Sequence, residues 1–119
     1  MDAIAARSDR EISVMICNYH DDDLPGPDAP VTLAISGLPD VPRVLMHHYR
    51  IDSQHSNSYI VWKEMGSPQN PTAAQKARLE AAGNLALLNS PSWEWTEAGT
   101  TVISFSLPRQ AVSLVQLSW

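Results

Sequence analysis

Residues 47–68 read HHYRIDSQHSNSYIVWKEMGSP and contain three kinds of local structure in succession. The run over residues 44–51 is rich in β-branched, aromatic and other large side chains, which predicts a strand. The polar residues 53–57 cannot bury a face, so they predict a loop. Apolar residues then recur at the spacing of a helix, at Tyr59, Trp62 and Met65.

Both ends of this short helix are marked in the sequence. Asn57 is a good N-cap, because its side-chain oxygen can accept from a backbone N–H that has no partner inside the helix. Gly66 suits the left-handed position after the last turn, and Pro68 prevents the helix from continuing. A helix of about two turns does not stand alone in water, so we expect Tyr59 and Trp62 to pack against another surface.

The strand before the loop alternates its side chains between two faces. His47 and His48 are adjacent and point to opposite faces, so they cannot easily bind one metal ion together with His55. No cysteine or glutamate nearby completes a ligand set, and we predict no metal site. One face carries Leu45, His47, Tyr49 and Ile51, and the other carries Val44, Met46, His48 and Arg50.

The composition is that of a chain of 119 residues with a hydrophobic fraction of 44% and a net charge of -5. These values predict one globular domain over residues 1–119. The negative charge argues against a nucleic-acid partner and against binding to anionic membranes. No apolar run approaches the ~18 residues of a membrane span, and residues 1–10 lack the apolar core of a signal peptide, which predicts a cytoplasmic location. The single Cys17 excludes an internal disulfide and is predicted to be a buried thiol.

Short apolar segments separated by Pro and Gly turns predict the rest of the fold. Residues 11–19 carry apolar side chains on both faces, which predicts a central strand covered on both sides. Thr72 and Gln75 form a capping-box pattern before an alanine-rich segment, so two helices make one insertion at about residues 57–83. The whole pattern predicts an all-β, antiparallel, immunoglobulin-like sandwich. Its other strands are expected at residues 3–6, 31–35, 93–95, 101–107 and 111–119.

Two tryptophans form a candidate binding surface. Trp93 and Trp95 alternate with polar residues, so they share one strand face in an arrangement that suits stacking on two sugar rings. Aromatic pairs at this spacing also serve in cores and interfaces. Residues 97–99 predict a hairpin turn into the next strand.

Motifs for other chemistry are scarce. The acidic loop could offer oxygen ligands to calcium, but it lacks the EF-hand spacing and its prolines suit a solvated turn. No G-x-S-x-G motif presents a serine nucleophile, no Gly-rich loop would hold a phosphate, and the glutamates form no pair suited to glycoside cleavage. We therefore predict no catalytic residue and no cofactor. The acidic residues of that loop are Asp21, Asp22, Asp23 and Asp28.

Three stretches resemble one family closely. They are NYHDDDLPGPDAPVTLAISGLP at residues 18–39, HYRID-x-x-HSNSY-x-x-W-x-x-MGSP-x-x-P at residues 48–71, and LPRQAVSLVQL at residues 107–117. With these motifs the chain resembles the C-terminal β-sandwich of glycoside hydrolase family 39. Within the family it is similar to the bacterial β-xylosidases, and the α-L-iduronidases are more distant relatives. The resemblance covers essentially the whole chain, and residues 48–71 are its most specific part.

The resemblance implies a domain without chemistry of its own. The family's enzymes are retaining glycosidases that carry this sandwich after a (β/α)8 barrel, and both catalytic glutamates lie on the barrel, one in an Asn-Glu-Pro motif. No Asn-Glu-Pro occurs here, and 119 residues cannot hold a barrel of ~250. We therefore expect an accessory domain of a β-xylosidase, inactive alone, whose partner is the barrel. The residues expected to brace the barrel are His55, Asn57, Tyr59 and Trp62.

Several alternatives stay open at this point. In the family, a piece near the N-terminus also joins the sandwich, and without it an open strand edge is expected to produce a homo-oligomer through that edge or the short helix. The second function, from another class, is a carbohydrate-binding module that uses Trp93 and Trp95. The third is a hydrolase that acts alone. The sequence leaves open whether the chain is a fragment or a separate accessory domain.

Overall fold

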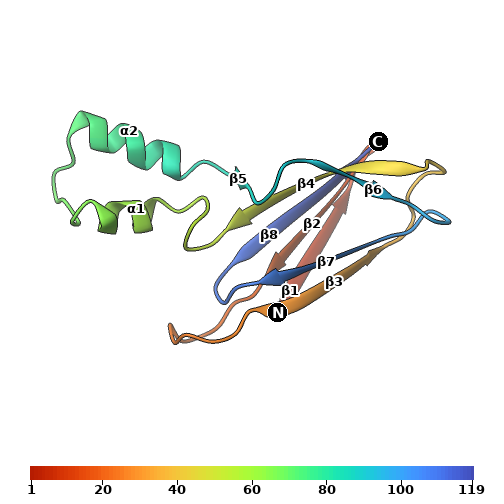
Figure 1. Cartoon of the computed structure of the whole chain (residues 1–119), viewed down its shortest axis with the longest axis horizontal. Helices are drawn as coiled ribbons and strands as arrows, with labels where there is room; N and C mark the ends of the chain where they lie inside the picture. Colours follow the sequence, from red (N-terminus) through yellow and green to blue (C-terminus); the bar gives the residue numbers. More distant parts are fainter.

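The computed structural model describes residues 1–119 as two β-sheets packed face to face with two short helices (Figure 1). This is the all-β sandwich that the sequence predicts. The elements are β1 (Asp2–Arg7), β2 (Glu11–Cys17), β3 (Ala29–Ile35), β4 (Arg43–Ile51), α1 (Ser58–Glu64), α2 (Ala73–Ala82), β5 (Ala86–Leu87), β6 (Ser92–Trp95), β7 (Thr101–Leu107) and β8 (Val112–Ser118).

The two sheets differ greatly in width. The larger sheet has the order β1-β2-β8-β4-β5, and β6 pairs with a different part of β4. The smaller sheet consists of β3 and β7 alone. Every strand pair is antiparallel, as predicted. The narrow sheet therefore covers only part of one face of the wide sheet.

The hydrophobic core lies between the sheets and consists of alternate residues of the facing strands, because successive side chains of a strand point to opposite faces. Val44, Leu107, Val115 and Leu117 have no exposed surface at all. The other core residues are Ile12, Val14, Ile16, Val31, Ile35, Leu38, Ile103 and Ala111.

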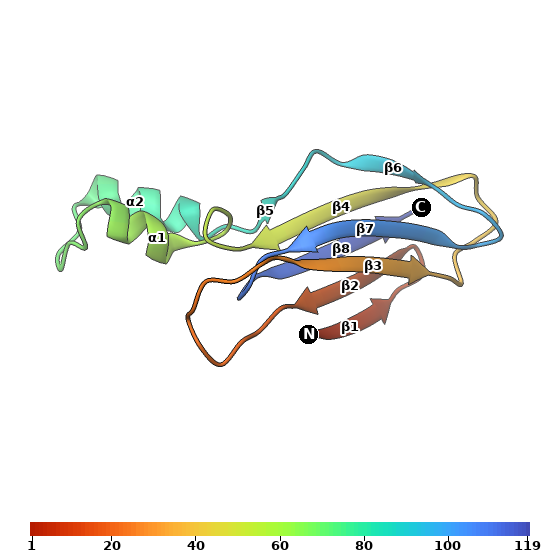
Figure 2. The ribbon, with the colours of Figure 1, turned by 60° about the horizontal axis from the view of Figure 1, so that its bottom comes forward.

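Both helices lie between β4 and β5 and project from one end of the sandwich (Figure 2). We call residues 57–83 the helical arm. Asn57 caps α1 by accepting from the backbone N–H of Ile60, and Thr72 caps α2 in a complete capping box with Gln75. The arm makes the molecule long, with extents of 55 × 31 × 20 Å.

Strand β2 differs from its prediction. It lies centrally between β1 and β8, but only the face with Ile12, Val14 and Ile16 is covered. Met15 on the other face is 39% exposed, and Cys17 is half-buried rather than fully buried. The unbroken apolar run over residues 14–17 predicts two apolar faces, but it does not indicate whether a second layer covers both.

The turn predicted at residues 97–99 is present, but it does not join two paired strands. A tight turn forms there, with a bridge between Glu97 and Thr100, but β6 pairs with β4 while β7 pairs with β3. The turn thus carries the chain from one sheet to the other. Gly99 has φ +72, and a Cβ there would lie 2.9 Å from the carbonyl oxygen of Leu38, so the position requires glycine.

Candidate interface at the base of the helical arm

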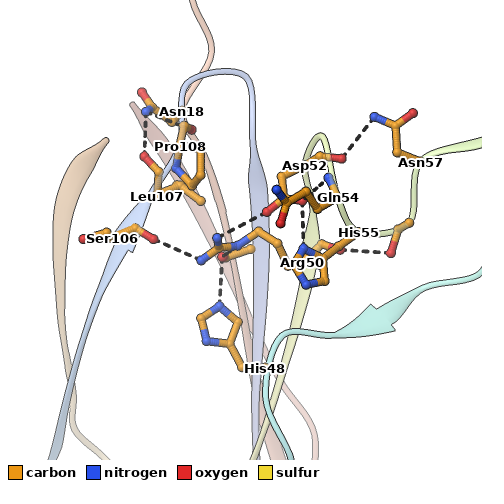
Figure 3. Close-up of polar contacts among 12 residues, drawn as sticks. Asn18, His48, Arg50, Asp52, Gln54, His55, Asn57, Ser106, Leu107 and Pro108 are labelled. Atoms are coloured by element: carbon orange, nitrogen blue, oxygen red, sulfur yellow. Dashed lines mark hydrogen bonds and ion pairs between the residues drawn. The ribbon is translucent and has the colours of Figure 1, made fainter. Parts of the chain in front are cut away.

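A buried polar cluster lies where β4 meets β8, at the end of the sandwich that bears the arm (Figure 3). Arg50 and Ser113 are opposite each other in the β4–β8 register, and both point inward. Arg50 donates from Nε to Ser113 Oγ at 2.8 Å and from Nη2 to the carbonyl oxygen of Ser106 at 3.1 Å. The guanidinium therefore joins the two sheets.

His48 completes the cluster through the same serine. Its Nε2 lies 2.8 Å from Ser113 Oγ. Because an arginine only donates, Ser113 Oγ accepts from Arg50, and its hydroxyl proton is then available to the Nε2 of a His48 that carries its own proton on Nδ1. Burial, helped by the positive charge of Arg50, lowers the pKa of His48 to about 4.

This Ser–His pair does not form a nucleophilic site. Ser113 is 0% exposed and His48 is 4% exposed, so no substrate reaches the hydroxyl. Arg50 Nε also donates to Ser113 Oγ, so it occupies an oxygen lone pair that a nucleophilic serine needs for attack on a carbonyl carbon. The cluster is structural, and it fixes β4 against β8 and β7.

Asp52 connects the buried cluster to the loop of residues 53–57. Its carboxylate lies 3.6 Å from Arg50 Nη1, and it accepts at 2.8 Å from both His55 Nδ1 and the backbone N–H of Gln54. Partial burial raises the pKa of Asp52, but the hydrogen bonds from Gln54 and His55 outweigh that effect, and the pKa falls below its usual value.

The next hydrogen bonds fasten the arm to the sandwich. Ser56 Oγ donates to the carbonyl oxygen of Arg50 at 2.9 Å and accepts from the N–H of Ala86 at 2.8 Å. Asn57 Nδ2 donates to the carbonyl oxygen of Asp52 at 3.0 Å while its Oδ1 caps α1 at Ile60. The polar residues of the HYRID-x-x-HSN stretch thus form one continuous network from the core to the first turn of the arm.

The two helices of the arm are joined by small contacts. Ser58 Oγ donates to the carbonyl oxygen of Leu79 at 2.9 Å, and a Cβ on Gly83 would lie 2.6 Å from that hydroxyl. Trp62 donates from Nε1 to the carbonyl oxygen of Pro68 at 2.9 Å. The arm is therefore held by backbone and hydroxyl contacts more than by apolar packing.

The partner surface expected for the short helix is not supplied by this chain. No residue of α1 is buried, Trp62 is half-buried, and Tyr59 is 61% exposed. The Tyr59 and Trp62 rings stack on each other, 5.9 Å between centroids, because they lie one turn apart. The apolar stripe of α1 is thus largely open to solvent.

A cavity of about 430 Å³ lies between the loop and the arm. His55 and Asn57 line it together with Glu64, and Tyr59 and Trp62 do not. The four residues expected at a domain interface are therefore split between the cavity and the adjoining apolar stripe. Glu64 is the single carboxylate of the cavity, and Glu11 is the single carboxylate of a smaller cavity of about 160 Å³ near β1.

The predicted tryptophan pair lies on β6, which runs beside the first residues of β4, at the end of that strand away from the arm (Figure 2). Trp93 is 51% exposed and Trp95 is 71% exposed, and both point away from the core. The Arg43 guanidinium lies 4.1 Å from the centre of the Trp93 ring. One ring is therefore free for stacking, and the other already has a cation on one face.

The acidic loop is held by side chains from the turn between β7 and β8. Asp22 pairs with Arg109 at 2.7 Å, and Gln110 donates to the carbonyl oxygens of His20 and Asp22, each at 2.7 Å. These contacts join the NYHDDD stretch to the LPRQ stretch. The structure brings no three His, Cys, Asp or Glu side chains close enough to bind one metal ion.

Sequence reasoning did not foresee the roles of Arg50 and Ser113. A signal existed, because Arg50 alternates with Val44, Met46 and His48 on the face that faces the core. A charged residue on such a face is rarely buried without a partner. Its partner Ser113 lies 63 residues away in the sequence, and nothing local indicates it.

Comparison with known proteins places the chain in a family. The model for glycosyl hydrolases family 39 matches residues 1–96, and the chain belongs to that family. No curated protein sequence matches it. None of its helices is long and apolar enough to cross a membrane.

Solved structures share the fold at low sequence identity. The family 39 enzyme of Xanthomonas axonopodis pv. citri matches 98% of this chain with a TM-score of 0.82 at 15% identity. A monomeric β-xylosidase from Caulobacter crescentus CB15 gives 0.73 at 20%, and a bacterial orthologue of human α-L-iduronidase gives 0.78 at 23%, each over 98% of this chain. The chain spans 22% to 26% of the length of these structures.

Proposed function

We propose that this chain is a non-catalytic, structural accessory domain of a retaining β-xylosidase-type glycoside hydrolase, and that its partner is the (β/α)8 catalytic barrel. The observation that carries the proposal is the family match over residues 1–96, combined with a fold that makes up 22% to 26% of the solved relatives. The parent activity would be hydrolysis of xylosides or xylo-oligosaccharides. The cytoplasmic location stays a prediction from the sequence.

The absence of a paired carboxylate site supports the non-catalytic role. A retaining glycosidase needs two carboxyl groups about 5–5.5 Å apart around the scissile bond. Each of the two cavities of this chain is lined by one carboxylate. The purified chain is expected not to hydrolyse an aryl β-xyloside, and turnover that disappears when Glu64 or Glu11 becomes Gln would contradict the proposal.

The geometry of the arm supports a bracing role. Its polar base is fixed to the core through Arg50 and Asp52, whereas Tyr59 projects into solvent from the open stripe of α1. A fixed base with an exposed aromatic tip suits contact with another domain. We place the contact with the barrel at His55, Asn57, Tyr59 and Trp62.

The reading frame around this chain gives the first test. A (β/α)8 barrel with an Asn-Glu-Pro motif in the same or an adjacent gene is the expected result, and its absence would overturn the proposal.

The barrel is then co-expressed with this chain carrying Tyr59→Ala and Trp62→Ala. Less soluble, less active barrel is expected, whereas Val102→Ala, at a 59% exposed site on β7, should have no effect. Equal barrel activity with all variants would contradict the bracing role.

The exposure of Trp93 and Trp95 favours a second candidate, a carbohydrate-binding module. Exposed indole rings on one strand face can stack on the apolar faces of sugar rings. Titration with xylose and xylo-oligosaccharides tests it. A saturable change in tryptophan fluorescence that Trp95→Ala abolishes would support it, and an unchanged spectrum would exclude it.

A further inference from the structure

The outward face of the wide sheet carries a continuous row of apolar side chains. Strand register places Ile4 opposite Met15, Met15 opposite Leu114, Leu114 opposite Tyr49, and Tyr49 opposite Leu87. We call these five residues the apolar ladder. It crosses β1, β2, β8, β4 and β5, and none of its members belongs to the core.

The ladder is partly open to solvent in the isolated chain, with exposed outer members and with Leu114 and Tyr49 half-buried at its centre. Ile4 is 66% exposed, Met15 is 39% exposed and Leu87 is 38% exposed. The next row adds Cys17 opposite Val112 and Val112 opposite Ile51, and Ile51 is 42% exposed. Contiguous apolar patches of this extent mark interaction surfaces on soluble proteins.

The ladder is symmetric about its central strand. β8 is the third of the five strands, so Leu114 has two apolar residues on either side. A twofold axis along β8 would place Leu114 against its own copy, and Met15 against Tyr49 of the second copy. Such a self-complementary patch is what an isologous dimer requires.

Charge and size are also compatible with a second copy. Asp2 and Glu11, the acidic residues on this face, lie off the axis, so each would be at least two strands away from its own copy. Five strands across and the seven residues of β8 along the strand direction make the face about 24 Å by 24 Å. Its flat area is on the order of 600 Å², and the side chains that project from it add to the surface that a partner can bury. A standard interface takes about 800 Å² from each partner.

We propose that the outward face of the wide sheet is the interface of a homodimer, in which two copies pack ladder on ladder. The inference does not depend on the proposed accessory role. It also moves the oligomer contact away from the open strand edge and the short helix that the sequence suggested. Two sheets packed in this way lie about 10 Å apart with their strands roughly aligned.

Sedimentation from low to high micromolar concentration tests the dimer. The wild-type chain should pass from monomer to dimer. Leu114→Glu should weaken the dimer about 100-fold, because two carboxylates would meet at the axis. Val102→Glu, on the outer face of β7, should leave it unchanged. A wild-type chain that stays monomeric at high micromolar concentration, or a dimer that survives Leu114→Glu, would overturn the proposal.

A crosslink provides a readout that does not depend on the folding of the glutamate variant. In a Cys17→Ser background, Leu114→Cys should be joined to its own copy by a short bis-maleimide, because the two positions 114 would face each other across the ~10 Å between the sheets, which is too far for a direct disulfide. Val102→Cys in the same background is the matched control and should stay largely monomeric. Equal crosslinking of both variants would contradict the proposed axis.

Discussion

Arg50 is the residue on which the base of the arm depends. Its three nitrogens contact Ser113, the carbonyl oxygen of Ser106, and Asp52, while its side chain is only 4% exposed. A planar guanidinium can serve three acceptors in fixed directions, and an ammonium on a flexible stem cannot. Removing one member of such a buried set leaves the others without partners, which is costly.

Arg50→Lys is therefore expected to destabilise the chain almost as much as Arg50→Ala, on the order of 3 kcal/mol. Urea denaturation followed by tryptophan fluorescence measures the change. Arg43→Lys on the same strand is the control, because Arg43 is exposed and lies over the ring of Trp93. If Arg50→Lys unfolds at the wild-type midpoint, the guanidinium geometry does not matter.

The buried His48 predicts a loss of stability in mild acid. Its pKa falls from 6.5 to about 4 on folding, so the unfolded chain binds a proton between these values that the folded chain does not. The free energy of unfolding should thus decrease as pH drops from 6.5 to 4, by up to about 3 kcal/mol. Folding lowers the pKa of the Asp52 carboxyl from 3.8, so this group reduces the free energy of unfolding further only as the pH falls below 3.8.

Urea denaturation at several pH values checks this slope. His48→Gln should flatten the decrease between pH 6.5 and 4, because no imidazole remains to be protonated. His47→Gln should keep it, since His47 points to the opposite face of β4. An identical slope in His48→Gln and the wild type would mean that another group causes the acid sensitivity.

At the scale of the elements, we expect the helical arm to open as a unit of its own. Neither helix has a buried residue, so the arm lacks a core and should open at a lower free energy than the sandwich. Its internal stability depends on the short contact between Ser58 and the end of α2. A double-mutant cycle on Ser58 and Gly83 tests this dependence.

Gly83→Ala should destabilise the arm by about 1 kcal/mol, because the added Cβ forces the Ser58 hydroxyl away from the Leu79 carbonyl oxygen. In a Ser58→Ala background the same change should be neutral or slightly stabilising, since Gly83 has a negative φ that alanine adopts easily. Hydrogen exchange of the α2 amides measures both effects. Equal effects in the two backgrounds would show that Ser58 and Gly83 do not interact.

The elements also show what a sequence can indicate. Caps such as Asn57 and Thr72 were predicted because the signal and its partner lie within a few residues of each other. The two faces of β4 were predicted because alternation is local. The pairing of β6 with β4, the open second face of β2, and the contact of Arg50 with Ser113 depend on distant strands, and no local pattern specifies them.

At the scale of the whole molecule, the arm gives the chain an unusual shape. The Cα radius of gyration is 17.0 Å, whereas a compact domain of this length would have about 13.5 Å. A chain with the arm folded back over the sandwich would be more compact than this. The hydrogen bonds of Ser56 and Asn57 to the backbone of residues 50 and 52 oppose that movement.

Small-angle scattering of dilute Leu114→Glu, which removes the proposed dimer contact, should give a radius of gyration near 17 Å rather than near 13.5 Å.

Replacement of residues 57–83 by a short Gly–Ser linker should reduce the radius and the longest dimension together, because the sandwich alone remains. Ser56→Ala combined with Asn57→Ala should broaden the distance distribution, since the arm then loses its contacts with the end of β4. A compact scattering profile for the intact chain would mean that the arm docks on the sandwich, and Tyr59 would then be covered by this chain instead of being free to contact a catalytic barrel.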